Sequence, residues 1–125
     1  MVVKLTEVQG RILCVLTGCK SHIKITGSMA WLSASAVTVV SQIEVDLMDA
    51  MELEARGYLY YHHRSGVHRV STKRVREDFP VYVTQWLLSG NSEVVESLEW
   101  LERHAIEDAG RGTKNPEDAS PWQEG

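Results

Sequence analysis

The 125-residue sequence has only two cysteines and three prolines, and it has no long uncharged hydrophobic stretch. No such stretch approaches the roughly 20 residues that a membrane-spanning helix needs, and charge appears too early at the amino terminus for the apolar core of a signal peptide. The sequence therefore predicts a cytoplasmic protein that does not enter a membrane. Cys14 lies among Ile, Leu and Val residues, which is typical of a buried free thiol rather than of a disulfide or a metal site.

The sequence also lacks the patterns that mark catalytic sites. It has no Ser, His and acid order typical of hydrolases, no glycine-rich phosphate loop and no paired carboxylates in a plausible pocket. His62, His63 and His68 lie close in sequence, but no nearby Cys or carboxylate completes a metal-binding set. We therefore expect a protein that is not an enzyme and that holds no metal ion or cofactor.

The chain has no overall excess of positive charge, but acidic and basic residues are concentrated in separate segments. The 13 Lys and Arg residues against 17 Asp and Glu residues give a formal net charge of -4, so the whole chain is not a polycation. Residues 44–54 contain five acids and no base, whereas residues 55–76 contain six bases and no acid. The basic segment predicts phosphate contacts, or alternatively a solvated hairpin whose charges keep an edge strand from pairing with other chains.

Local patterns predict mostly helices. Thr6 followed by Gln9 is typical of a helix amino terminus, Ser41 followed by Glu44 resembles a second such capping box, and Pro80 favours a helix over a strand for residues 81–88. The expected helices are 7–17, 28–32, about 42–56, 81–88 and about 92–108, with a short strand at 22–26 and a hairpin at 58–71. Residues 109–125 lack periodicity and predict a flexible tail.

The expected hairpin separates its side chains into two faces. If Arg64 pairs with Val67, alternation along the strands gives one apolar face and one polar, basic face. The apolar face then carries Leu59, Tyr61, His63, His68 and Val70, and the polar face carries Tyr60, His62, Arg64, Val67, Arg69 and Ser71.

Residues 47–59 (LMDAMELEARGYL) and 64–71 (RSGVHRVS) resemble the passage between the recognition helix and the wing of MarR-like and related bacterial and phage regulators. The resemblance covers about residues 6–76. It implies a mainly α fold with a small β-hairpin: a winged helix-turn-helix domain over residues 1–76, a helical extension over 77–108, and the tail over 109–125. Such regulators place their third helix in the major groove of duplex DNA and their wing beside the phosphates.

This resemblance implies that the protein is a small DNA-binding regulator that contacts duplex DNA mainly through its basic wing. Of the Arg, Lys, Asn and Gln residues that usually read bases, the groove-facing side of the third helix offers only Gln42, while Asp46 and Asp49 would meet phosphate repulsion. The expected nucleic-acid contacts are Gln42, His62, Arg64, Arg69, Lys73, Arg74 and Arg76.

The alternative is a non-enzymatic protein-binding module, such as a phage-type inhibitor of nucleic-acid machinery, that engages a basic protein through acidic helix faces. Its expected contacts are Val45, Asp46, Asp49, Glu52, Leu53 and Trp100. Trp100 either anchors such an interface or packs on a neighbouring helix or in a dimer. For the DNA-binding regulator we expect a homodimer formed through the first and last helices.

Overall fold

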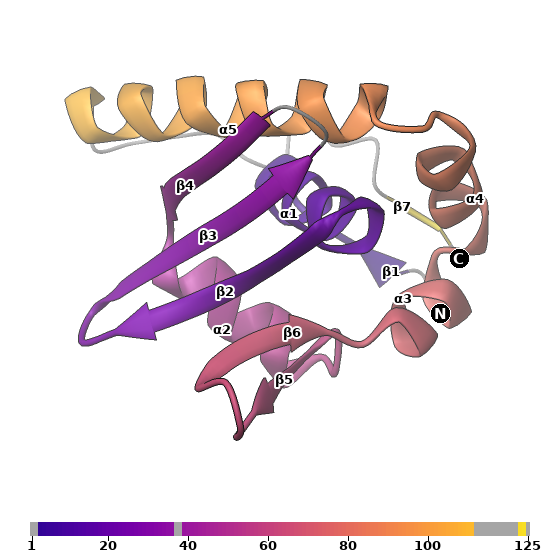
Figure 1. Ribbon diagram of the computed structural model, residues 1–125, viewed down its shortest axis with the longest axis horizontal. Coiled ribbons are helices and arrows are strands. Elements are labelled where there is room, and N and C mark those ends of the chain that lie inside the picture. Colours follow the sequence, from indigo (N-terminus) through magenta and orange to yellow (C-terminus); the bar gives the residue numbers. More distant parts are fainter. Residues whose placement is uncertain (1–2, 37–38, 112–122, 125) are drawn as a thin grey trace.

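The computed structural model describes residues 3–36, 39–111 and 123–124. In chain order its elements are β1 (Val3–Lys4), α1 (Glu7–Gly18), β2 (Lys20–Thr26), β3 (Met29–Ala36), β4 (Val39–Val45), α2 (Leu47–Ala55), β5 (Leu59–His62), β6 (Val67–Val70), α3 (Thr72–Asp78), α4 (Pro80–Leu88), α5 (Ser92–Arg111) and β7 (Gln123–Glu124). The main sheet is antiparallel with strand order β4-β3-β2-β6-β5, and β1 pairs separately with β7 (Figure 1).

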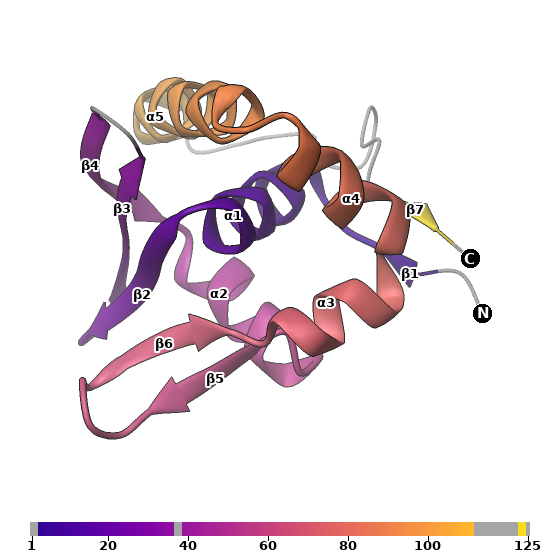
Figure 2. The same cartoon turned by 45° about the vertical axis from the view of Figure 1, so that its right-hand side comes forward.

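This is an α+β fold built on a five-stranded sheet, so the expectation of a mainly α winged helix-turn-helix with a small hairpin was wrong. Helices α1, α2 and α5 lie on one side of the sheet (Figure 2). Helix α1 is the central one, and its expected start is confirmed. Thr6 Oγ1 accepts a hydrogen bond from the Gln9 amide, and Gln9 Oε1 accepts one from the Thr6 amide, both at 3.1 Å.

The expected helix at 28–32 was wrong, because this segment belongs to strand β3. Gly27 and Ser28 form a two-residue turn that places Thr26 opposite Met29, and Gly27 has a φ of 62°, which a hairpin turn of this kind requires and glycine adopts easily. Ala30, Leu32 and Ala34 are buried toward the helices. Met29 and Trp31 are apolar residues on the opposite face. The alternation of apolar and polar residues that usually marks a strand is therefore not visible in this part of the sequence.

The expected helix from 42 to 56 was wrong in its first part. Strand β4 begins with the β-branched residues Val39 and Val40 and pairs with β3 as far as Val45. Helix α2 begins only at Leu47, where Asp46 Oδ1 accepts a hydrogen bond of 2.8 Å from the Met48 amide. Ser41 and Glu44 therefore lie in a strand and not at the start of a helix.

The hairpin of β5 and β6 is confirmed, but its register differs from the expected one. His62 pairs with Val67 and Tyr60 with Arg69, so Arg64 lies in the turn instead of pairing with Val67. The shift is by two residues, which leaves Leu59, Tyr61, His68 and Val70 on one face, as expected. After the hairpin, the sequence predicted the helix that starts at Pro80 but not the short helix α3.

One hydrophobic core holds these elements together. It runs from Leu5 to Leu101 and so joins residues of both expected segments, 1–76 and 77–108. Cys14 is buried in it as a free thiol, and burial raises the pKa of that thiol to about 12.

The expected flexible tail, residues 109–125, lies largely outside the described residues. In the described parts of the chain, no helix is both long enough and apolar enough to cross a bilayer.

Candidate nucleic-acid interface

The face of the sheet opposite the helices is the main candidate for a binding surface. No described helix or strand covers it (Figure 2). Alternation along the five strands places mainly polar, cationic and aromatic side chains there, together with the apolar Met29 of β3 and Val67 of β6. The others are Lys20, His22 and Lys24 of β2, Trp31, Ser33 and Ser35 of β3, Gln42 and Glu44 of β4, Arg69 of β6, and Tyr60 and His62 of β5. We call this surface the open face.

One row of side chains crosses the open face from edge to edge. The strand pairings place Gln42 beside Ser33 and Ser33 beside His22, and the pairing of Ile23 with His68 sets His22 beside Arg69. Arg69 in turn lies opposite Tyr60 on the edge strand β5. With neighbouring strands about 4.8 Å apart, the row is about 19 Å long. We call Gln42, Ser33, His22, Arg69 and Tyr60 the polar row.

Part of the polar row lines a recess of about 600 Å³. The recess is lined by Lys20, Ser21, His22, Ser33, Ala34, Ser35, Gln42 and Arg69. Its volume lies within the range of about 300–1,000 Å³ that small-molecule sites occupy. Hydroxyl, amide, imidazole and cationic groups meet in it, so it offers hydrogen-bond donors and acceptors together with positive charge.

The open face is positively charged although the chain as a whole is negative. Lys20, Lys24 and Arg69 lie on it, and the strands that form it contribute a single acid there, Glu44. Partial burial lowers the pKa of His22 below its ordinary value of 6.5, and the positive charges of Arg69 and then Lys24 lower it further. The pKa of His22 therefore reflects its burial first and the neighbouring cations second.

Two aromatic side chains stand beside cations on the open face. Trp31 is half-buried and is paired across the strands with Lys24 and Glu44. Tyr60 is 47% exposed and lies opposite Arg69. The sequence predicted a helix at residues 28–32 and so did not place Trp31 on a sheet face. In the sheet, Ala30 and Leu32 on either side of it are buried toward the helices, which leaves Trp31 on the open face.

The expected nucleic-acid contacts divide into two groups. Gln42, His62 and Arg69 lie on the open face, with Arg64 exposed in the turn beside it. His62 Nδ1 lies 2.7 Å from Ser65 Oγ within that turn. Lys73, Arg74 and Arg76 instead belong to α3, at the other end of the hairpin (Figure 1). Arg74 Nε donates to Asp78 Oδ2 at 3.2 Å, so this cation is already paired.

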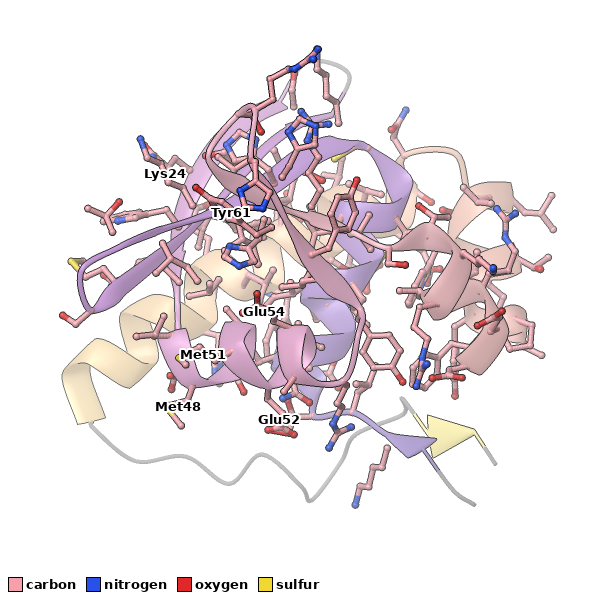
Figure 3. The ribbon with its side chains drawn as sticks, turned by 90° about the horizontal axis from the view of Figure 1, so that it is seen from below. Lys24, Met48, Met51, Glu52, Glu54 and Tyr61 are labelled. Carbon is pink, nitrogen blue, oxygen red and sulfur yellow. The ribbon has the colours of Figure 1, made fainter. Side chains whose placement is uncertain are left out.

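The expected protein contacts on α2 change because the helix starts later. Val45 and Leu53 are 7% and 0% exposed, so the prediction that they lie on the surface was wrong. Asp46 caps the helix, Asp49 accepts a hydrogen bond of 3.4 Å from Gln9, and Glu52 pairs with Arg56 at 2.8 Å. The exposed apolar side chains of α2 are those of Met48 and Met51, at 69% and 48% (Figure 3).

Trp100 packs within the chain. It stacks on His104 with 4.6 Å between ring centroids, and the Arg11 guanidinium lies 5.6 Å from its ring. Helix α1, with its apolar residues buried, also packs on α5 inside the same chain. A homodimer through these two helices stays a prediction.

The histidines of the hairpin do not meet as a group. Tyr61, not His63, faces His68, whose Nε2 lies 3.0 Å from Glu54 Oε2 on the helix side of the sheet. Within residues 3–36, 39–111 and 123–124, no three His, Cys, Asp or Glu side chains are placed to hold a metal ion.

Neither the models of known protein families, nor curated protein sequences, nor solved structures match this chain.

Proposed function

We propose that this chain is a non-enzymatic nucleic-acid-binding protein that holds the phosphate backbone on its open face. The observation that carries this proposal is the gathering of Lys20 and Arg69 in a polar recess, with Lys24 two residues beyond His22 on β2, on an uncovered sheet in a chain of net charge -4. Lysine and arginine on one surface supply most of the sequence-independent affinity for nucleic acid.

The roles of the side chains follow from their places. Arg69 is the central phosphate contact, because it lines the recess and belongs to the polar row. Lys20 and Lys24 extend the positive charge along β2, and Arg64 adds to it from the exposed turn. Gln42 and Ser33 provide neutral hydrogen-bonding groups at the far side of the recess. Helix α2, which the resemblance assigned to the major groove, carries acids and has no contact in this proposal.

A salt series tests the proposal. Binding of a fluorescently labelled oligonucleotide, single-stranded or duplex, is followed by anisotropy while the salt concentration is raised. We expect log K to fall linearly with log salt, and Arg69→Gln and Lys24→Gln to reduce the slope by about 0.7 to 0.9 for each lost phosphate contact. Arg103→Gln, at an exposed position on α5, is the matched control and leaves the slope unchanged. Absence of binding to both oligonucleotides at low salt contradicts the proposal.

A second candidate function, protein binding, is favoured by the exposed methionines of α2. Met48 and Met51 are one helical turn apart and lie beside Glu52 and Glu54 (Figure 3). Methionine adapts to varied partners, and the surrounding acids suit a basic amphipathic helix. Titration calorimetry with a lysine-rich amphipathic peptide tests this candidate. Met48→Ser with Met51→Ser should abolish binding, whereas Leu87→Ser with Leu88→Ser, at exposed positions on α4, should not.

A further inference from the structure

We infer that the nucleic acid bound on the open face is single-stranded, with bases stacked on Trp31 and Tyr60. This inference rests on the proposed function and specifies its ligand. A phosphate contact alone does not distinguish a single strand from a duplex, because both present the same backbone. The aromatic side chains make the distinction, because the faces of bases inside a duplex are covered by neighbouring base pairs and are free only in a single strand.

Each aromatic ring has a cation as its cross-strand neighbour. Trp31 lies beside Lys24, and Tyr60 lies beside Arg69. An aromatic ring for the base and a cation for the adjacent phosphate together match the repeating unit of a nucleic-acid strand. The arrangement occurs twice on the open face, once on each side of the β2–β6 junction.

The distance between the two pairs fits several nucleotides. Trp31 is on β3 and Tyr60 is on β5, which are three strand spacings or about 14 Å apart across the sheet. Stacked nucleotides advance about 3.4 Å each, so a single strand that touches both rings has nucleotides between them. Those nucleotides pass over His22 and Arg69, which line one side of the recess of about 600 Å³.

The recess suits a base or phosphate of the intervening nucleotides. His22 on β2 and Ser33 on β3 offer hydrogen-bonding groups for the edge of a base, whereas Gln42 lies on β4, beyond the span between the two rings. Arg69 in the same recess supplies charge for a phosphate. A duplex would reach this face only with its phosphates, and the recess and both rings would contribute little.

The test compares a single strand with a duplex of the same length, about 12 nucleotides. Anisotropy titrations are made at one low salt concentration with oligothymidylate and with a blunt duplex. The variants are Trp31→Leu and Tyr60→Leu, which keep apolar bulk but remove the ring. The matched control is Tyr61→Leu, because Tyr61 follows Tyr60 on β5 and is 45% exposed but faces the helix side of the sheet.

We expect the single strand to bind more tightly than the duplex, and each ring-removing variant to weaken single-strand binding about tenfold or more. Tyr61→Leu should change it by less than about twofold, since that ring lies off the open face. Trp31→Phe keeps a stacking surface and should retain most of the affinity, which separates lost stacking from a folding defect.

Two results overturn the inference in different ways. If the duplex binds as tightly as the single strand and the Leu variants bind like the unchanged protein, the single-strand inference is wrong while the proposed function stands, provided that Arg69→Gln still weakens binding. If neither oligonucleotide binds, both the inference and the proposed function are wrong.

Discussion

At the scale of single residues, His22 lies in the recess, where a bound nucleic acid would change its charge. Its pKa lies below 6.5 in the free protein because of partial burial and the nearby charges of Arg69 and Lys24. A phosphate in the recess would offset those positive charges and raise the pKa of His22 again. Binding would then take up a proton, and affinity should rise as the pH falls.

Anisotropy titrations between about pH 7.5 and about pH 5.5 should therefore show increasing affinity, with a plateau once the pH is below the pKa of the free protein's His22. His22→Gln should flatten this dependence. His68→Gln is the matched control, because His68 lies on the helix side of the neighbouring strand, where Glu54 is its partner. An identical pH profile in the His22 variant and the unchanged protein would exclude this histidine as the proton-binding group.

Tyr58 contributes to stability at the same scale. It is 2% exposed, and its hydroxyl donates a hydrogen bond of 2.7 Å to Asp78 Oδ2, the oxygen that also accepts from Arg74. Burial and then this bond raise the pKa of Tyr58 to about 12, so it stays a donor at neutral pH. Tyr58→Phe should lower the free energy of unfolding by about 1.5 to 3 kcal/mol in urea titrations, as expected for a bond to a charged group. The exposed Tyr61→Phe should cost less than about 0.5 kcal/mol.

At the scale of elements, the end of α1 requires close contact with α5. A methyl group added to Gly18 would overlap Val94 Cγ2, and Val94 is fully buried and has little rotamer freedom to move away. Gly18→Ala should therefore lower the free energy of unfolding by about 1 to 3 kcal/mol, although alanine favours helices. Val94→Ala in the same chain should recover part of the loss. Equal stability of Gly18→Ala and the unchanged protein, measured by urea titration, would mean that the two helices can separate at this point.

The elements also show which parts of the fold the sequence could predict. The start of α1 depends on nearby residues, Thr6 with Gln9, and is confirmed; the β5–β6 hairpin is confirmed with a register shifted by two residues. Strands β3 and β4 were missed although they pair with their neighbours in sequence, because both faces of β3 carry apolar residues and Ser41 with Glu44 resembled a helix start. Val45 looked like a surface residue only because the helix was expected to start too early.

The open face was even less accessible to sequence reasoning. His62, Arg69 and Gln42 were expected to contact nucleic acid, but for a different geometry. What brings Gln42 of β4 and Arg69 of β6 to one recess is the strand order, in which β2 and β3 lie between them. No local pattern specifies that order, nor does it show which side of the sheet the helices cover.

At the scale of the whole molecule, the separation of charge affects binding at long range. The chain carries a net charge of -4, and acids on α5 such as Glu99 and Glu102 are exposed. Their repulsion of nucleic acid acts through solvent and is screened beyond about 8 Å at physiological salt. Glu44, by contrast, lies on the open face beside Trp31, within reach of a bound phosphate.

The affinities of a variant at Glu99 and Glu102 and of a variant at Glu44 should depend differently on the salt concentration. Glu99→Gln with Glu102→Gln halves the net charge of -4 and should raise the affinity for an oligonucleotide at low salt only, because counterions screen the distant charges as salt is added. Glu44→Gln removes a single charge but should raise the affinity across the whole salt range, because the repulsion that it relieves acts over a distance shorter than the screening length. Anisotropy titrations of both variants over the same salt series make the comparison. If the α5 variant gained affinity at every salt concentration and the Glu44 variant gained none, the nucleic acid would lie against α5, and the open face would not be its binding surface.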